Sequence, residues 1–314
     1  MGAVHQLIRQ HGRDEAKRLA GTQQATAIDL AARVMEDSST ALAVTYSGFC
    51  LTALPHKRLK DDTAKWLREG PRVSLLVEPG SLPVRGKLQQ YGVPYGSRAR
   101  MILLYLQTKA VQTDCPVVEL GRSMNDWLRS MGVPVGGKTY DDVREQASRI
   151  SACSLTFFWQ DERGADGWRK DRIVSSGIHL STTGNTDQGS LWEDQVELSQ
   201  TFFKELKRHP VPVAEAAIRA ISGKSVALDI YIWLAYRLHV LTRPTPITWA
   251  ALREQHGPVY KSTAQFKAAF IEPLTLALAV YEDARVDVDD NGITLHPSRP
   301  PVPEREIGRI TGHR

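Results

Sequence analysis

The sequence lacks the features that mark membrane-spanning, secreted and disulfide-rich proteins. No run approaches eighteen consecutive apolar residues, and the first twenty residues contain His, Arg, Asp, Glu and Lys where a signal peptide needs an apolar stretch. There are three cysteines, Cys50, Cys115 and Cys153, and their odd number and wide spacing predict neither a disulfide framework nor a CxxC metal pair. We therefore expect a soluble, cytoplasmic protein with no membrane partner.

The sequence also lacks the common catalytic and metal-binding motifs. Its nine histidines include no HxH pair and no HExxH, which removes the ligand sets of a relaxase-type nicking centre and of a zinc hydrolase. No GxSxG is present to position an acyl-transfer serine. We therefore expect no cofactor, no metal, no catalytic residue and no enzymatic activity.

Composition restricts the partners only weakly. The 40 basic and 35 acidic residues give a net charge of +5 and a pI near 9.1, which suits a polyanionic partner but is shared by many proteins that bind no nucleic acid. With 314 residues, 42% of them hydrophobic, the chain can bury the cores of two or three domains.

An internal duplication is the strongest structural signal. Apolar residues spaced i, i+3, i+4, i+7 predict a helix over 97–112, Ser123 caps a second helix, and a third helix opens at Thr139. Two apolar runs, 154–160 and 172–181, come next and are interpreted as a hairpin. Three helices and a hairpin make one copy.

The same order returns about 125 residues later. A helix through Ala227–Leu238 is followed by a short helix capped by Thr248 and by a third helix from Ser262, which Pro273 should kink or end. An Asn-Gly turn within 284–296 predicts the closing hairpin. We therefore predict a helix-rich α+β fold with tandem winged-helix domains preceded by a small N-terminal α/β portion.

Four regions are expected from this pattern. An amphipathic helix over 24–37 and strands over 40–49 and 72–79 belong to the N-terminal portion. The predicted boundaries are 1–90 for the N-terminal helical arm and small α/β portion, 91–212 for the first winged helix, 213–303 for the second, and 304–314 for a tail.

The outward residues of the third helices and the first hairpin are the candidate DNA contacts. A winged helix can place its third helix in the major groove and its hairpin on the phosphate backbone. The alternative is a solvated surface, because Asp141, Asp142 and Glu145 dilute the charge of the first helix. The candidates on the helices are Lys138, Thr139, Arg144, Gln146, Ser148, Arg149, Lys261, Thr263, Gln265 and Lys267, and those on the hairpin are Arg163, Trp168, Arg169, Lys170 and Arg172.

Two motifs favour a rival, enzymatic interpretation. Gly132–Thr139, GVPVGGKT, matches the GxxxxGK[ST] phosphate-loop pattern, but helical periodicity rather than a buried strand precedes it. Asp287 and Asp289 match the paired carboxylates of metal-dependent nucleotidyl transfer, yet they adjoin an Asn-Gly turn, where Asp is favoured for local reasons.

Several stretches resemble the plasmid-encoded RepA replication initiators of bacteria. The resemblance spans about 45 to 303, with its most specific block over 94–150. The matching stretches are LPHKR at 54–58, 91–113, 118–150, 225–238 and 256–270. In that family the loop at Gly136-Gly137 lies between two helices of a DNA-binding unit.

The resemblance implies a plasmid replication initiator. Such a protein binds directly repeated origin sequences (iterons) in double-stranded DNA as a monomer, opens adjacent AT-rich DNA, and recruits the host replication initiator and replicative helicase. A homodimer, or coupling of DNA-bound copies, would limit copy number. The alternatives are a sequence-specific transcriptional repressor and, from another class, a P-loop ATPase or primase-like enzyme that uses Gly132–Thr139 or Asp287 and Asp289.

Overall fold

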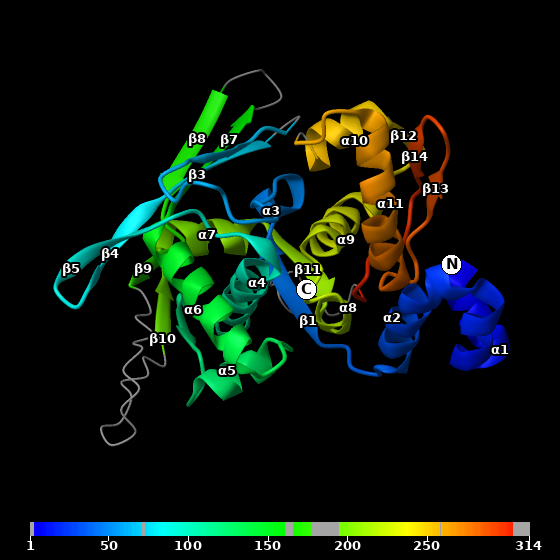
Figure 1. Ribbon diagram of the computed structural model, residues 1–314, viewed down its shortest axis with the longest axis horizontal. Helices are drawn as coiled ribbons and strands as arrows, with labels where there is room; N and C mark the ends of the chain where they lie inside the picture. The colour runs from blue at the N-terminus through cyan, green and yellow to red at the C-terminus, as the bar shows by residue number, and fades with distance from the viewer. Residues whose placement is uncertain (1–2, 71–72, 161–165, 177–194, 258, 304–314) are drawn as a thin grey trace. The chain divides into compact units, whose positions relative to one another are not determined.

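The chain forms two compact units in a computed structural model (Figure 1). We call them the terminal unit, which holds Met1–Ala43, Phe49–Leu51 and Val211–Arg314, and the middle unit, which holds Val44–Gly48 and Thr52–Pro210. Strands β1 (Leu42–Tyr46) and β11 (Pro210–Ala214) carry the chain between them. The residues that the structure describes are 3–70, 73–160, 166–176, 195–257 and 259–303.

The middle unit contains the first copy of the predicted repeat. Its three helices are α4 (Gly96–Thr113), α5 (Met124–Ser130) and α6 (Gly137–Ala152). Strand β6 lies between α4 and α5 along the chain, and it joins β9 and β10 in an antiparallel sheet with the order β6-β10-β9. These strands are β6 (Val117–Glu119), β9 (Val174–Ser176) and β10 (Gln195–Leu198).

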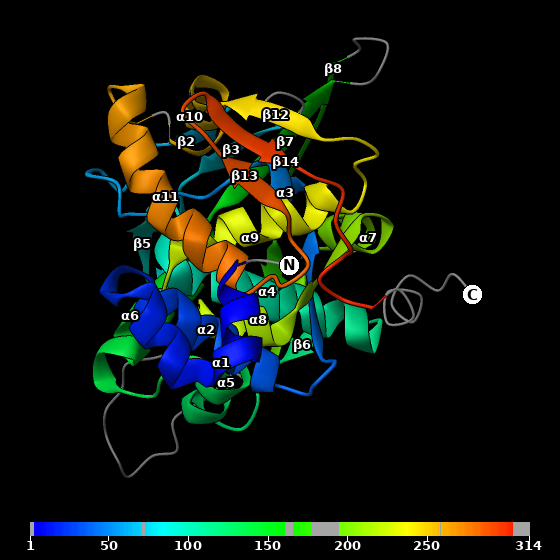
Figure 2. The same ribbon diagram turned by 90° about the vertical axis from the view of Figure 1, so that its right-hand side faces the viewer.

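The terminal unit contains the second copy, in the same order. Its elements are α9 (Ser225–Leu238), β12 (Thr245–Thr248), α10 (Trp249–His256), α11 (Thr263–Ala279), β13 (Val286–Val288) and β14 (Gly292–Leu295). The sheet order, β12-β14-β13, matches that of the first copy, and Figure 2 shows this sheet beside α10 and α11. The predicted order of three helices is found in both copies, each with an added strand after its first helix, and the hairpin predicted after the third helix forms in the second copy.

Local sequence signals explain where these elements begin. Three hydroxyl side chains act as N-caps, those of Ser123, Thr248 and Ser262. Each hydroxyl oxygen accepts a hydrogen bond from the backbone N–H of the residue three positions later. In the β13–β14 turn, the Asp289 carboxylate accepts hydrogen bonds from the backbone N–H groups of Asn291 and Gly292 at 2.7 and 2.9 Å.

One local prediction was wrong, because α6 begins at Gly137 rather than at Thr139 and no side chain caps it. Of the two effects predicted for Pro273, an end to the helix is not seen, since α11 continues to Ala279. The missing N–H of a proline removes one helical hydrogen bond, and the packing of Phe270 and Leu274, both buried, holds the helix on either side of it.

The hairpin predicted after α6 has a different partner strand. Residues 154–160 form β7 (Ser154–Gln160), but this strand pairs with β8 (Asp166–Asp171), whereas β9 pairs with β10. β7 also joins β3 (Val73–Glu78), which pairs with β2 (Trp66–Arg68), so the four strands form one antiparallel sheet. The part of the predicted strand after residue 176 lies outside the described residues.

The N-terminal portion predicted over 1–90 is divided between the units. The remaining elements are α1 (Ala3–Ala20), η1 (Thr22–Gln24), α2 (Ala25–Glu36), α3 (Gly48–Leu51), β4 (Gly80–Val84), β5 (Lys87–Tyr91), α7 (Gln200–Arg208) and α8 (Glu215–Ala220). α2 packs on α11 in the terminal unit, and β3 extends the sheet of the middle unit. Within the described ranges, no helix is long and apolar enough to cross a membrane.

Candidate nucleic-acid interface

The start of α6 exposes the first candidate cation. Lys138 is exposed and Thr139 is half-buried in the first turn of the helix. The glycine-containing segment Gly132–Thr139 joins α5 to α6, so a helix precedes it, as the periodicity predicted. The strand-to-helix geometry in which a phosphate loop aims its backbone N–H groups at a nucleotide is not formed here.

Two predicted base readers on α6 are buried. Gln146 and Arg149 are each only 3% exposed. The Gln146 side-chain oxygen accepts a hydrogen bond from the backbone N–H of Tyr95 at 2.8 Å. Arg149 donates to the carboxylates of Asp62 and Glu145, both at 2.9 Å, and to the backbone oxygen of Val93 at 3.2 Å. Because neither side chain can reach a base from these positions, the base-reading prediction is wrong for both.

The buried guanidinium belongs to a network that neutralises nearby acids. Arg58 lies 2.5 Å from the Asp62 carboxylate and 3.6 Å from that of Glu145, so two arginines face two carboxylates. Burial alone would raise the pKa of Asp62, but hydrogen bonds from Arg58 and Arg149 outweigh it, and the pKa is lowered. Both acids are therefore compensated where they would otherwise repel phosphate.

The outward side of α6 retains two further candidates. Arg144 and Ser148 are half-exposed, and the Arg144 guanidinium lies 3.9 Å from the Asp141 carboxylate. This long, solvent-exposed pair restrains the arginine weakly. α6 can therefore offer Lys138, Thr139, Arg144 and Ser148 to a partner.

The four candidates of the second copy lie at the start of α11. Lys261 and Gln265 are exposed, and Thr263 is half-exposed. Lys267 lies 3.0 Å from the Asp290 carboxylate and 5.3 Å from the centre of the Trp249 ring. Lys267 is therefore already engaged by its own unit, whereas Lys261 and Gln265 project at the helix start.

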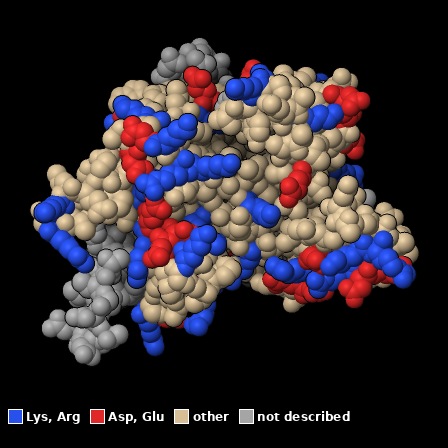
Figure 3. Space-filling view, viewed as in Figure 1, with Lys and Arg blue, Asp and Glu red and all other residues tan. Residues whose placement is uncertain are grey.

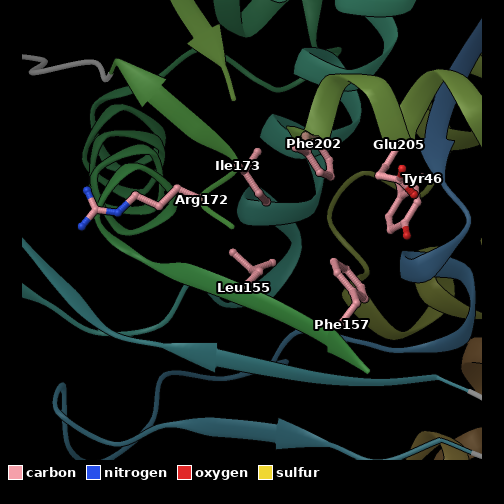
Figure 4. Close-up of a pocket in the computed structure, with 7 residues that line it drawn as sticks. All are labelled: Tyr46, Leu155, Phe157, Arg172, Ile173, Phe202 and Glu205. Carbon is pink, nitrogen blue, oxygen red and sulfur yellow. The ribbon is translucent and has the colours of Figure 1, made fainter. Parts of the chain in front are cut away.

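The candidates of the first hairpin lie on or beside the four-stranded sheet instead. Trp168 on β8 is 68% exposed, and the Lys170 ammonium lies 2.5 Å from the Glu78 carboxylate. Arg172 is exposed beside a small, mainly apolar hollow, and in Figure 4 its guanidinium points away from the aromatic side chains that line it. Arg163 lies outside the described residues, and the side chain of Arg169 is not described.

Sequence reasoning missed apolar side chains exposed beside both third helices. Val135 and Val259, in the turns before α6 and α11, are 47% and 75% exposed. Along α11, Ala264, Ala268 and Ala269 are exposed. The available signal was the Pro-Val pair that precedes a lysine in each copy, as PVGGK and PVYK. Ala and other small apolar groups can contact the methyl group of thymine.

The paired aspartates of the rival interpretation have structural partners. The Asp287 carboxylate lies 2.8 Å from the His296 ring nitrogen, and Asp289 caps the β13–β14 turn. Across the described part of the chain, no group of three or more His, Cys, Asp or Glu side chains is arranged to hold a metal ion.

Comparison with known proteins identifies the family. The model of the family described as "Plasmid encoded RepA protein" matches residues 93–251, half of the chain. The chain therefore belongs to the plasmid-encoded RepA family, and it is a replication initiator. This confirms the resemblance carried by the block from Pro94 to Ile150.

Solved structures and curated sequences add little to this assignment. Two crystal structures of domains 2 and 3 of RctB match at 15% identity. The match to the first covers 80% of this chain and 95% of the RctB chain, with a TM-score of 0.49. The match to the second covers 77% of this chain and 92% of the RctB chain, with a TM-score of 0.47. No curated protein sequence matches the chain.

Proposed function

We propose that this protein is a non-enzymatic plasmid replication initiator that binds repeated origin sequences in duplex DNA through two winged-helix units. The observation that carries the proposal is the repetition of one element order with one sheet order, β6-β10-β9 and β12-β14-β13. In each copy a lysine is exposed where the third helix starts, at Lys138 and at Lys261. Family membership supplies the plasmid context.

The proposed contacts divide into phosphate and base groups. Lys138 and Lys261 would hold phosphates, since an exposed ammonium at a helix start can reach the backbone beside a groove. Arg144, Ser148, Thr263 and Gln265 would face base edges, with Arg144 suited to guanine and Gln265 to adenine. Two units in one chain would let a monomer read two successive major-groove faces.

Footprinting on the DNA that flanks the protein's own gene tests the proposal. Regularly spaced protection of direct repeats, without a requirement for ATP and Mg²⁺, is expected. The Lys138→Ala/Lys261→Ala double variant should weaken all protection, and Arg144→Ala should weaken it at one position of each repeat. Protection only with ATP, or no sequence preference, would contradict the proposal.

Origin opening and helicase recruitment separate an initiator from a repressor. Permanganate reactivity of AT-rich DNA beside the protected repeats should appear with the wild-type protein, as should co-purification of host initiator and helicase on that DNA. A repressor would give the same footprint without either signal. Sedimentation of the protein with a single repeat would establish whether the monomer is the binding form.

A further inference from the structure

The β4–β5 hairpin is a largely exposed element of the middle unit outside the repeat. All four residues of β5 from Lys87 to Gln90 are exposed, and Leu88, at 79%, has the largest exposure among the exposed large hydrophobic side chains of the described chain. Figure 1 shows the two strands reaching beyond the helices of their unit. A two-stranded ribbon gains little stability from its own burial, so this hairpin depends on what its base and its surface contact.

The hairpin is built to hold a basic tip. Val84 pairs with Lys87 around a two-residue turn, Arg85-Gly86, whose φ angles of 49° and 76° are both positive. A turn of this kind matches the twist of the two strands. A positive φ is strained for a residue with a side chain, and Arg85 adopts one at the first position of the turn. The turn therefore presents the side chains of Arg85 and Lys87, both exposed, at the end of the ribbon.

Charge around the ribbon favours a polyanion. Residues 79–113 contain no Asp or Glu, although the chain has 35 acidic residues, and among the described residues neither Arg85 nor Lys87 forms an ion pair. In Figure 3 the end of the molecule where Figure 1 places the tip shows blue without red beside it. Leu88 pairs with Pro83 behind the tip, which places two exposed apolar side chains next to the two cations.

The base of the ribbon is fixed to α6, the helix that carries the proposed readers. A Cβ at Gly80 would lie 2.1 Å from the backbone oxygen of Ala152, so only glycine allows this approach. The Cys153 thiol donates to the backbone oxygen of Gly92 at 3.5 Å, and Arg149 donates to that of Val93. Both ends of the hairpin are therefore held at the C-terminal end of α6.

We propose that the β4–β5 hairpin is a third DNA-contacting element, a ribbon that grips duplex DNA beyond the site of α6. Arg85 and Lys87 bind phosphates, and Leu88 lies against the sugars and bases of the groove. A two-stranded ribbon fits a DNA groove, and exposed Leu and Pro side chains can be inserted at base steps. This inference rests on the proposed function and extends the contact surface beyond the two third helices.

Salt-dependent binding by the full-length protein tests the proposal. The slope of log K against log salt is negative, and its magnitude decreases by about 0.9 for each phosphate that the protein no longer neutralises. Arg85→Ala/Lys87→Ala should therefore decrease this magnitude by about 1.8, on origin DNA and on random duplex alike. Leu88→Ser should weaken binding about tenfold while the slope stays unchanged. The control Lys109→Ala/Lys204→Ala removes two exposed cations from α4 and α7 and should leave the slope as it is.

The outcomes separate the hairpin from the proposed function. If origin DNA binds no better than random duplex, the proposed function fails, but the slope on random duplex still measures the hairpin. A wild-type slope in Arg85→Ala/Lys87→Ala overturns the hairpin proposal. The proposal is also overturned if this variant sediments differently from the wild type but binds DNA equally well, because the ribbon would then serve to pair two copies of the chain.

Discussion

The third helices of the two repeats are held in place by different chemistry. α11 is packed by aromatic rings, with Phe266 and Phe270 5.0 Å apart and Trp249 within 6.5 Å of both. α6 buries Val143, Ala147 and Ile150 and adds the polar contacts of Gln146 and Arg149, both also buried. One element order therefore tolerates two kinds of core. The polar contacts keep two candidate side chains away from the surface of α6, whereas the aromatic core leaves the exposed side of α11 intact.

The copies also differ in the strands that come after the third helix. In the terminal unit, β13 and β14 form the next hairpin, closed by the turn at Asp289–Gly292. In the middle unit, β7 and β8 come first and extend the sheet of β2 and β3, and β9 pairs with β10 only later in the chain. This insertion places Trp168 and Lys170 on a separate sheet, so the second copy is the simpler unit in which to measure a contact of its hairpin.

Removing an aromatic ring from α11 should give the largest effect on stability. Phe270 is 2% exposed and contacts Trp249, His256 and Phe266, so Phe270→Ala should lower the free energy of unfolding of the terminal unit by about 3–5 kcal/mol. Urea unfolding followed by tryptophan fluorescence measures this. Gln265→Ala on the exposed side of the same helix is the control, with a change within about 0.5 kcal/mol. Equal costs would contradict the aromatic core.

Removing the buried arginine from α6 should cost less. The Arg149 side chain is 4% exposed, but its partners Asp62 and Glu145 are about one-third exposed and can be rehydrated. Arg149→Ala should therefore cost about 2–3 kcal/mol, below the value for a fully buried pair, with no change of base preference. Arg144→Ala is the matched control, because it should leave stability within about 0.5 kcal/mol and weaken DNA binding. A stable Arg149→Ala protein with altered base preference would refute the buried network.

Local patterns in the sequence were sufficient for the helices, caps and second hairpin. The apolar faces of α4 and α9 are buried as the periodicity predicts, and Ser123, Thr248 and Ser262 cap the helices that begin after them. These features depend on residues a few positions apart, so one sequence is enough to find them.

The buried polar residues of α6 depend on distant partners. Arg149 binds Asp62, 87 positions away, and Gln146 binds Tyr95, 51 positions away. Helical spacing does place residue 146 between Val143 and Ile150 on the inward side, but a polar residue type suggested solvent. The pairing of β7 with β3 was missed for the same reason, since it joins strands about 80 residues apart, whereas the other partner, β8, follows β7 directly in the chain. Sequence periodicity identifies a face and cannot identify the element that covers it.

Acidification should destabilise the terminal unit through one histidine. His5 on α1 is 2% exposed, and its Nε2 donates to the backbone oxygen of Ala279. Burial lowers the pKa of His5 below 6.5, although that hydrogen bond and Glu282 partly oppose the shift. The unfolded chain therefore takes up a proton first, and stability is lost as pH falls below about 6.5.

The contribution of His5 is measured as a difference between two proteins. Urea midpoints of the wild type and of His5→Gln should differ at pH 7.5 and converge as the pH falls below about 6.5, because Gln keeps a donor for Ala279 but does not titrate. The other histidines are common to both proteins. Parallel midpoints at every pH would remove His5 as the cause. No matching effect is expected in the middle unit, which His5 does not belong to.

The smallest effects should come from single lysines at the helix starts, and they compare the two repeats directly. Lys138→Ala and Lys261→Ala should each decrease the magnitude of the salt slope of origin binding by about 0.9, because each exposed ammonium would replace one counterion. Lys267→Ala should change the slope less, since the Lys267 ammonium lies 3.0 Å from the Asp290 carboxylate, which partly neutralises its charge. Fluorescence anisotropy over a range of salt concentrations gives the three slopes. A slope change for Lys138→Ala alone would mean that only the middle unit grips the backbone, and equal changes for Lys261→Ala and Lys267→Ala would show that the Asp290 pair opens on DNA.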